Sequence, residues 1–369
     1  MKPIRVLQVL ASLNRGGAEA MIMNLYRNID RSKVQFDFVV NDSSEKYSYE
    51  REIEKMGGKV FRVPRYTVTN YASYKKAWEE LIIHHPEWKI IHGHHTSPAF
   101  IYLHVAKRLK RITIAHSHIA GGEKTLKSYF KSIIRYPTRY TAEYLFACSE
   151  SAAEWMFGNK SSRAYVLNNS IEAKKFIYSE STRKEKREEL GIEKKFVIGH
   201  VGRFQTQKNH SFIIDIFKTI HEKNDDAILL LVGEGELRTV ITEKVEKLGL
   251  TNYVIFTGVR ADIPELLQAM DLFLFPSLYE GLGMVAIEAQ AAGLPCIVAD
   301  TIPKEAFITN LIESVSLKEP GDFWGKKILR YKEIDYQRLN RYEEIKSKKY
   351  DIGETSKWLE DFYISSWKV

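Results

Sequence analysis

Cysteine is scarce in this chain, since only Cys148 and Cys296 occur among its 369 residues. Two cysteines without a paired spacing exclude a disulfide framework and a cysteine-rich metal site. No uninterrupted apolar run approaches the roughly 20 residues that a membrane-spanning helix needs. The apolar start, residues 1–10, is short and broken by Gln8, so we interpret it as a first strand rather than a signal peptide. These absences predict a cytoplasmic protein that does not span a membrane.

Acidic residues are nearly missing from residues 101–140, which hold nine basic residues and one acid. Because the net charge of the whole chain is +8, its surplus is concentrated here. Four of these cations recur at the spacing of one helix face: Lys124, Lys127, Lys131 and Arg135. Such a face can bind the anionic inner surface of a plasma membrane, at about 1 kcal/mol per charge, although a solvated face over a core stripe is at least as common. No zinc-finger, RNP or helix-turn-helix pattern accompanies the charge, so we expect no nucleic-acid partner.

Short β-branched runs alternate with amphipathic helical stretches along the chain, which predicts parallel sheets covered by helices on both faces. The expected strands are 6–10, 34–40, 59–63, 89–91, 112–115 and 144–148, then 196–201, 227–232, 253–256, 272–275, 296–298 and 314–317. Between the two groups, residues 179–195 are polar and charged like a linker. Since a domain usually has roughly 100–200 residues, we predict two doubly wound α/β domains, residues 1–178 and 179–353.

Two glutamates flank a glycine loop in the second of these domains. Glu280 comes before the loop, and Glu288 follows it in a stretch with helical character, so we expect Glu280 in the loop and Glu288 one turn inside a helix. Free amides at a helix start can donate to a phosphate, and carboxylates accept hydrogen bonds from a vicinal diol. The pattern predicts a site for a sugar nucleotide, although taken alone it also fits an ordinary strand–loop–helix unit.

Cations and glycines follow the first strand of each domain. Arg203 and Lys208 come after strand 196–201, where a guanidinium fork and an ammonium suit two neighbouring phosphates and the charge that grows as a diphosphate leaves. Gly16 and Gly17 precede a helical stretch, so amides there can approach a diphosphate, although the pattern is not G-x-G-x-x-G. Ordinary solvated loops and a plain tight turn are the alternatives. In open parallel sheets ligands collect at these strand ends, so two such domains face to face predict a cleft.

Histidines crowd two strand ends in the first domain: His92, His94 and His95, then His116 and His118. A His-x-His pair can bind a metal, but no third ligand with a suitable spacing stands out, and the chain has no Asp-x-Asp motif. We therefore expect no metal and favour hydrogen bonds to sugar and phosphate, with a structural role for His92 and a functional role for His118.

The motifs together resemble the family 4 glycosyltransferases of the GT-B fold, nearly from end to end. The resemblance rests on ordered blocks in the second half: Val201-Gly-Arg-Phe-Gln-Thr-Gln-Lys-Asn-His210, Leu231-Val-Gly-Glu-Gly-Glu236, Phe256-Thr-Gly-Val-Arg-Ala-Asp-Ile-Pro264, Phe275-Pro-Ser-Leu-Tyr-Glu-Gly-Leu-Gly-Met284 and Glu288-Ala-Gln-Ala-Ala-Gly-Leu-Pro295. The segment 301–305 looks like the branch that builds bacterial capsular and exopolysaccharide repeat units. The segment 168–170 departs from the Pro-Asn-Gly of many relatives.

This resemblance implies a retaining transfer, without a bound metal or other cofactor, of a hexosyl or N-acetylhexosaminyl group. The donor is a nucleoside diphosphate sugar, with UDP favoured, and the acceptor is a hydroxyl of a glycan or a polyprenyl-diphosphate-linked glycan. By matching motif, the catalytic residues are Arg203, Lys208, Glu280 and His118. The donor-binding residues are Gly16, Gly17, Gly202, Val259, Arg260, Ile263, Gly281, Leu282, Gly283, Met284 and Glu288. The resemblance also implies that a closing helix, 354–369, crosses back to the first domain. Its helical spacing of Trp358, Phe362 and Ile364 or Ser365 predicts an aromatic face that needs a surface to bury.

Three rival functions fit the same sequence. A nucleotide-sugar epimerase on the same fold would turn over its substrate with no acceptor present. A catalytically silent glycan- or lipid-binding subunit would bind no nucleotide. A nicotinamide oxidoreductase would bind NAD(P), which the incomplete glycine motif at Gly16 and Gly17 disfavours.

Overall fold

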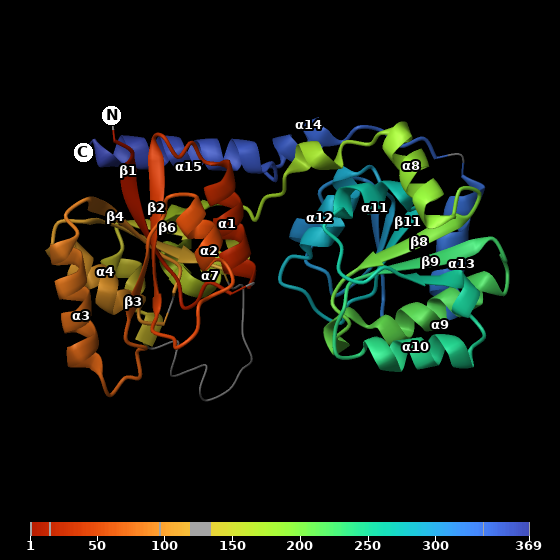
Figure 1. The fold of residues 1–369 in the computed structure, drawn as a ribbon, viewed down its shortest axis with the longest axis horizontal. Helices are drawn as coiled ribbons and strands as arrows, with labels where there is room; N and C mark the ends of the chain where they lie inside the picture. Colours follow the sequence, from red (N-terminus) through yellow and green to blue (C-terminus); the bar gives the residue numbers. More distant parts are fainter. Residues whose placement is uncertain (1, 15, 96, 119–133, 335, 369) are drawn as a thin grey trace. The chain divides into compact units, whose positions relative to one another are not determined.

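The structure is a computed structural model that describes residues 2–14, 16–95, 97–118, 134–334 and 336–368. The chain forms two compact units (Figure 1). The N-terminal unit comprises residues 1–170 and 352–369, and the C-terminal unit comprises residues 171–351. Among the described residues, no helix has both the length and the apolar content that crossing a membrane requires.

The N-terminal unit is built on a seven-stranded parallel sheet with the order β3-β2-β1-β4-β5-β6-β7. Its strands are β1 (Ile4–Val9), β2 (Val34–Asn41), β3 (Val60–Val63), β4 (Trp88–Gly93), β5 (Ile112–Ser117), β6 (Tyr144–Ala147) and β7 (Ala164–Val166). The order reverses between β1 and β4, because the chain first adds strands on one side of β1 and then on the other. Such a switch point leaves a crevice at the carboxyl ends of the two strands.

Helices cover both faces of this sheet, because residues along β1 alternate between two cores. Leu7 and Val9 face a core formed with α3 (Tyr71–His84), α4 (Ala99–Arg108) and α7 (Glu150–Phe157), whereas Val6 faces a core formed with other helices. These are α1 (Gly17–Asn28), α2 (Glu50–Lys55) and the last helix of the chain, α15 (Ile352–Trp367). A short helix, α6 (Thr138–Thr141), precedes β6.

The C-terminal unit repeats this plan with a six-stranded parallel sheet, in the order β10-β9-β8-β11-β12-β13. Its strands are β8 (Phe196–Val201), β9 (Ala227–Val232), β10 (Val254–Phe256), β11 (Leu272–Phe275), β12 (Cys296–Ala299) and β13 (Ile312–Val315). Its helices are α8 (Glu180–Leu190), α9 (His210–His221), α10 (Arg238–Lys247), α11 (Ile263–Ala269), α12 (Met284–Ala291), α13 (Gly321–Glu333) and α14 (Tyr342–Ser347). The predicted fold class, two doubly wound parallel α/β sheets, is confirmed.

The predicted linker at 179–195 is wrong, because residues 180–190 form α8. Ser179 caps this helix by accepting a hydrogen bond from the backbone of Thr182, and Gly191 ends it in a left-handed conformation. The helix is polar, yet it packs against α11 through Arg183 and Arg187, which lie one turn apart. Its buried face is therefore made by arginines rather than by apolar residues.

The final helix does return to the first unit, as predicted. Part of the predicted aromatic face is buried, since Phe362 and Ile364 pack against the core while half-buried. Leu359 and Tyr363 are the most buried large side chains of α15, which packs on β1, β2 and β4. Trp358 is 40% exposed and lies at the edge of this contact, next to Phe362 and Phe146.

Candidate active site

The switch point of the C-terminal unit lies between β8 and β11, and the loops that follow both strands are fastened together there. The backbone amide of Leu278 donates to Gln207 (2.8 Å), and the Gln207 side chain donates to the carbonyl of Tyr279 (2.9 Å). Asn209, in a left-handed conformation with φ of 56°, donates from its side chain to the carbonyl of Pro276 (3.1 Å). The two loops thus form one continuous surface at the carboxyl ends of the strands.

Lys208 and Glu280 meet on this surface. Lys208 Nζ donates to Glu280 Oε1 at 2.6 Å, and the two side chains are only 15% and 8% exposed. The ammonium also lies 4.9 Å from the centre of the Phe275 ring. Since a nearly buried ion pair is favourable only when both charges stay paired, a ligand that separates these two groups must replace each partner. A molecule with both an anionic group and hydroxyl groups can do so.

Arg203 lies on the same loop as Lys208 and is exposed. Its guanidinium forms no hydrogen bond or ion pair with any residue that the structure describes. Gly202, next to it, leaves room for the folded lysine, because a Cβ atom there would lie 3.2 Å from Lys208 Cδ and 2.8 Å from His200 Nε2. On this loop Arg203 is therefore an unpaired cation among the described residues, whereas Lys208 is paired.

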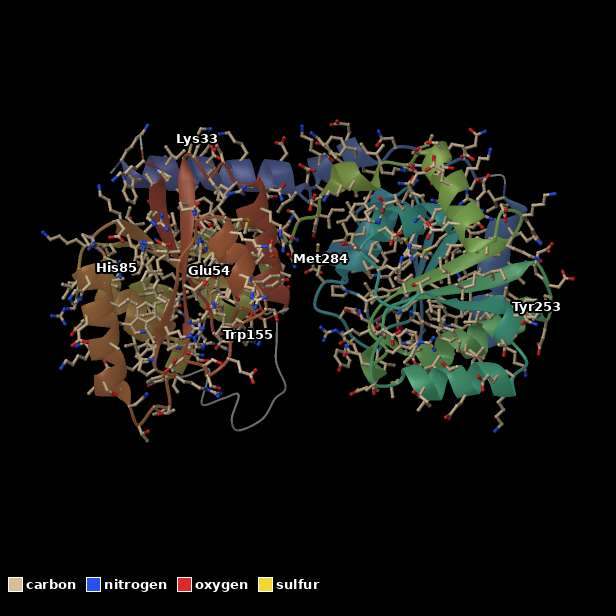
Figure 2. All side chains as sticks on the ribbon, in the orientation of Figure 1. Lys33, Glu54, His85, Trp155, Tyr253 and Met284 are labelled. Atoms are coloured by element: carbon tan, nitrogen blue, oxygen red, sulfur yellow. The ribbon has the colours of Figure 1, made fainter. Side chains whose placement is uncertain are left out.

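The loop that begins at Glu280 leads directly into α12. In this loop Leu282 lies between Gly281 and Gly283, which differ in backbone conformation and in the space around them. Gly283 caps the helix with φ of 80°, and a Cβ atom there would lie 3.2 Å from the Phe275 ring. Gly281 has no described atom within 4 Å of the position of a Cβ and does not have positive φ. Met284, the first residue of α12, is labelled in Figure 2. The amides at this helix start can donate to an anion or a hydroxyl.

Glu288 lies one turn inside α12, as the sequence predicts. Its carboxyl group has no hydrogen bond or ion pair with the described residues, and burial raises its pKa to about 7. Glu288 is half-buried, and an unpaired carboxyl group that has lost part of its water is costly. A vicinal diol would supply the two donors that it lacks.

The remaining donor-site candidates of this unit lie between β10 and α11. Val259 is 75% exposed, and Ile263 is the first residue of α11. Arg260 donates to Asp262 (2.6 Å) and to Glu189 (3.0 Å), and these two carboxylates raise its pKa. Its guanidinium is therefore already used within the protein.

The other predicted residues belong to the N-terminal unit, at the switch point between β1 and β4. Gly16 caps α1, and Gly17 is its first residue. A Cβ atom at Gly17 would meet no described atom within 4 Å, so packing does not require glycine there. His118 follows β5 and is half-buried, and burial lowers its pKa to about 4.

Four histidines of β4 and β5 lie together with two residues that the sequence analysis did not select, Gln8 and Tyr363. His92 and His94 are bonded to these two residues, His92 to Tyr363 (2.6 Å) and His94 to Gln8 (2.8 Å). Gln8 interrupts an apolar strand, which was the available signal, whereas Tyr363 comes from a distant part of the sequence. Both nitrogens of His92 are hydrogen-bonded within the protein.

A third potential metal ligand is present, contrary to the sequence analysis. One nitrogen each from His92, His94 and His116 lies within 4.8 Å of the others, because the pairing of β4 with β5 places their strand ends side by side. Burial lowers the pKa of all three well below the usual value, so the imidazoles are neutral. Neutral imidazole is the form that binds a metal.

Most of the predicted basic face, Lys124, Lys127 and Lys131, lies outside the described residues. Arg135 is described, and its guanidinium lies 3.6 Å from the centre of the Trp155 ring. This cation therefore packs against the protein itself.

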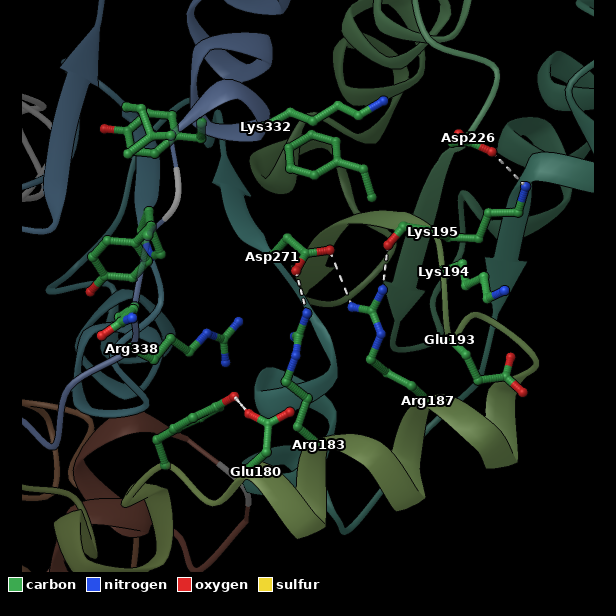
Figure 3. A pocket seen from close by; sticks show the side chains of 17 residues that line it. Glu180, Arg183, Arg187, Glu193, Lys194, Lys195, Asp226, Asp271, Lys332 and Arg338 are labelled. Atoms are coloured by element: carbon green, nitrogen blue, oxygen red, sulfur yellow. Dashed lines mark hydrogen bonds and ion pairs between the residues drawn. The ribbon is translucent and has the colours of Figure 1, made fainter.

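A cavity of about 700 Å³ opens at the opposite end of the C-terminal sheet, before β8, β11 and β12 (Figure 3). Three arginines converge there on the last carbonyls of α11: Arg183 on 268–270, Arg187 on 269, and Arg338 on 267, 268 and 270. Asp271 accepts hydrogen bonds from two of them. These guanidiniums cap a helix end, where cations are favoured, so we do not assign the cavity to the candidate site.

Two family profiles match this chain, "Glycosyltransferase Family 4" over residues 15–175 and "Glycosyl transferases group 1" over residues 182–321. The putative glycosyltransferase EpsF of Bacillus subtilis (strain 168) is 34% identical over 336 residues, which cover 88% of this chain and 87% of EpsF. A UDP-Gal:alpha-D-GlcNAc-diphosphoundecaprenol alpha-1,3-galactosyltransferase of Escherichia coli is 34% identical over 149 residues, 39% of this chain and 38% of that enzyme. The crystal structure of Anabaena Alr3699/HepE in complex with UDP has a TM-score of 0.78 at 19% identity, and the match covers 99% of this chain and 100% of that one.

Proposed function

We propose that this chain, which belongs to the family 4 glycosyltransferases and has the GT-B fold, transfers a sugar from UDP-sugar to a hydroxyl of a glycan or a lipid-linked glycan, with retention at the anomeric carbon. The chain is a glycosyltransferase that uses a nucleoside diphosphate sugar. The choice of UDP, of a hexosyl or N-acetylhexosaminyl group and of a surface-polysaccharide acceptor is our proposal.

Three similarities support the finer parts of this proposal. Alr3699/HepE has been solved with UDP-glucose, which favours UDP. The name of the Escherichia coli relative gives a diphosphoundecaprenol-linked acceptor, which favours a lipid-linked glycan. A Vi polysaccharide biosynthesis protein of Salmonella typhi is 38% identical over 100 residues, 27% of this chain and 17% of that protein, which favours a surface polysaccharide. A lipid-linked acceptor would bring the enzyme to the inner face of the plasma membrane.

The contact between Lys208 and Glu280 is the observation that carries the proposal. In the proposed complex the diphosphate takes Lys208 away from Glu280, Arg203 binds a neighbouring phosphate oxygen, and Glu280 is freed to accept hydroxyls of the donor sugar. The amides at the start of α12 donate to the same ligand, and Glu288 accepts the ribose diol. As the diphosphate leaves, the two cations stabilise its growing charge.

Lys208→Ala tests this assignment. We expect turnover to fall by orders of magnitude in a protein that still folds, because a cation lost from the transition state costs several kcal/mol. The melting temperature should also fall, because Glu280 loses its partner. The matched control is Lys218→Ala, on the exposed face of α9, where the lysine pairs with Glu222. Near-normal turnover by Lys208→Ala would contradict the proposal.

A thermal-shift panel of UDP-, GDP-, ADP- and TDP-sugars identifies the donor, because a ligand present at 100 times its Kd stabilises the native state by about 2.7 kcal/mol. Stabilisation by no nucleotide sugar would reject the proposal. Conversion of a stabilising nucleotide sugar into an epimer without any acceptor would favour the epimerase instead.

A further inference from the structure

Six side chains form one hydrogen-bonded network at the carboxyl ends of β1, β4 and β5. Its members are Gln8, His92, His94, His116, His118 and Tyr363. All except His118 are buried, and among the described residues no carboxylate bonds to any of them. Because no carboxylate of the described residues balances a charge in this buried network, the imidazoles are neutral, and each ring carries one N–H and one lone pair. The position of each proton then follows from its neighbours.

The amide of Gln8 sets the direction of the first branch. Gln8 Oε1 can only accept, and it lies 2.8 Å from His94 Nε2, so His94 carries its proton on Nε2. His94 Nδ1 is therefore an acceptor, and it lies 2.8 Å from His118 Nε2. His118 must donate from Nε2, which leaves its Nδ1 as a lone pair. No described residue bonds to this Nδ1.

The second branch agrees with this direction. Gln8 Nε2 donates to the hydroxyl of Tyr363 at 3.2 Å, which is within the range of an N–H donor but long for an O–H donor. If the Gln8 amide were reversed, the hydroxyl of Tyr363 would have to donate to Gln8 over this long distance. Tyr363 in turn donates to His92 Nδ1 (2.6 Å), and His92 Nε2 donates to His116 Nδ1 (3.2 Å). The amide orientation of one glutamine thus sets the tautomers of four histidines, with His116 Nε2–H as the one nitrogen of the network's buried rings that has no hydrogen-bond partner among the described residues.

We propose that Gln8 and His94 are positioning residues that hold His118 in its Nε2–H tautomer, so that its Nδ1 accepts a hydrogen bond from a sugar hydroxyl. The identity of that hydroxyl rests on the proposed function. The network makes His118 an acceptor rather than a cation, which suits a neutral hydroxyl and not a phosphate. Gln8 and His94 act only through His118.

A metal ion bound by the same histidines is the competing arrangement. His92 Nε2 and His116 Nδ1 are 3.2 Å apart, their ring planes differ by 20°, and their ring centres are 5.2 Å apart. This is close to an edge-to-edge hydrogen bond, in which the two nitrogens point at each other rather than toward a shared ion. Elemental analysis of the purified protein tests the alternative directly.

The tautomers can be measured in the wild-type protein without any variant. Two-bond ¹H–¹⁵N correlation spectra of ¹⁵N-histidine-labelled protein at pH 7.5 distinguish Nε2–H from Nδ1–H rings, and a His118→Gln spectrum assigns the signals of His118. We expect His94 and His118 as Nε2–H tautomers. A His118 ring found as Nδ1–H or as imidazolium, or stoichiometric zinc on the histidines, overturns the proposal.

Gln8→Met tests whether the glutamine is responsible, because methionine keeps the length of the side chain and removes both hydrogen bonds. We expect the His118 spectrum to change to a mixture of tautomers. The matched control is Gln35→Met, a buried glutamine on β2 that donates to Tyr26 and Met56 and has no hydrogen bond to a histidine among the described residues. An unchanged His118 spectrum in a folded Gln8→Met variant overturns the role of Gln8.

Kinetics add a readout that separates this inference from the proposed function. We expect Gln8→Met to lower kcat for release of UDP from UDP-glucose by about 10- to 100-fold with little change in KM, as when partners that orient ligating histidines are lost. The control variant should match wild type. If wild type releases no UDP from UDP-glucose while the tautomers are as inferred, UDP-glucose is rejected as the donor and the inferred hydrogen-bonded network is kept. An altered tautomer in Gln8→Met with unchanged kcat overturns the positioning role.

Discussion

At the scale of single residues, Glu288 couples the candidate site to pH. Its pKa is raised from 4.5 to about 7 by burial, so the folded protein holds this proton more tightly than the unfolded chain. The stabilising contribution of this group to the free energy of unfolding is therefore fully present below pH 4.5 and is lost as the pH rises to about 7. Its size is about 3 kcal/mol. A ligand that donates two hydrogen bonds to the carboxylate would offset this cost.

Binding of UDP should consequently weaken as the pH falls below 7, because the neutral acid cannot accept as the carboxylate does. We expect up to about a 10-fold rise in Kd per pH unit, measured by calorimetry at pH 6, 7 and 8. Glu288→Gln should bind more weakly and lose this dependence. An equal pH dependence in both proteins would argue that Glu288 does not contact the ribose.

The two glycines before α12 should respond oppositely to a side chain. Gly281→Val is expected to leave the melting temperature within about 1 °C of wild type but to abolish UDP-glucose binding, since the space beside Gly281 is open. Gly283→Val should lower the free energy of unfolding by about 2 kcal/mol or more, because a valine at φ of 80° is strained and approaches Phe275. Denaturant titration and calorimetry separate the two effects. Normal binding by Gly281→Val would show that the loop is not part of the site.

The positions of Glu280 and Glu288 could be predicted because a strand, a glycine loop and a helix are consecutive in sequence. The pairing of Lys208 with Glu280 joins two loops that are 72 residues apart, and only the motif resemblance suggested it. Gln8 and Tyr363 could not be selected from the sequence, because they act through a hydrogen bond to each other and are 355 residues apart.

At the scale of elements, α11 depends on arginines that cap its carboxyl end. Arg338 lies largely buried against this end, and burial, with nearby Arg183, lowers its pKa to about 10. It donates to the carbonyls of 267, 268 and 270. A single side chain thus satisfies three of the acceptors that a helix end leaves free.

Arg338→Met should therefore lower the free energy of unfolding by about 1–3 kcal/mol, since it leaves the carbonyl of residue 267 without a side-chain donor and leaves the carbonyls of 268 and 270 to Arg183 alone. Arg330→Met, an exposed arginine of α13, is the control and should change it by less than about 0.5 kcal/mol. Chemical denaturation measures both. UDP affinity should be unaffected, because Arg338 and the candidate site lie at opposite ends of the sheet. Equal stability of the two variants would reject the capping role.

Two elements show why composition alone misled the prediction. The stretch that forms α8 has no apolar stripe, and its burial depends on Arg183 and Arg187, which bond to α11 and Asp271. In α15 the spacing of the aromatic residues suggested the buried face, but Trp358 is 40% exposed, whereas Leu359 and Tyr363 are buried. In both cases the partner surface decided which side chains face inward, and a single sequence does not contain that surface.

At the scale of the whole molecule, α15 belongs to the N-terminal unit although it follows the C-terminal unit in the chain. Leu359 and Tyr363 fill the core made by α1, β1 and β2, and Glu360 accepts from the backbone of Asp30 and from Lys33. The alternation of strands and helices revealed both sheets from sequence because it is a property of the whole chain. The return of α15 rested on the family resemblance.

Leu359→Ala should lower the stability of the N-terminal unit by about 2–5 kcal/mol through the cavity that it leaves. Asp361→Ala, at an exposed position of the same helix, is the control. Differential scanning calorimetry with UDP, which is expected to protect the C-terminal unit, should resolve two transitions. Only the transition that UDP does not raise should move in Leu359→Ala, and movement of both transitions would contradict two independently cored units.

The position of α15 has a consequence for synthesis on the ribosome. While the chain is being translated, the apolar side chains of the first unit over β1, β2 and β4 stay uncovered until α15 emerges, because this helix is encoded after the whole second unit. The second unit can therefore acquire its own core before the first unit is complete. A premature stop codon between the second unit and α15 would damage the part of the enzyme that was made first.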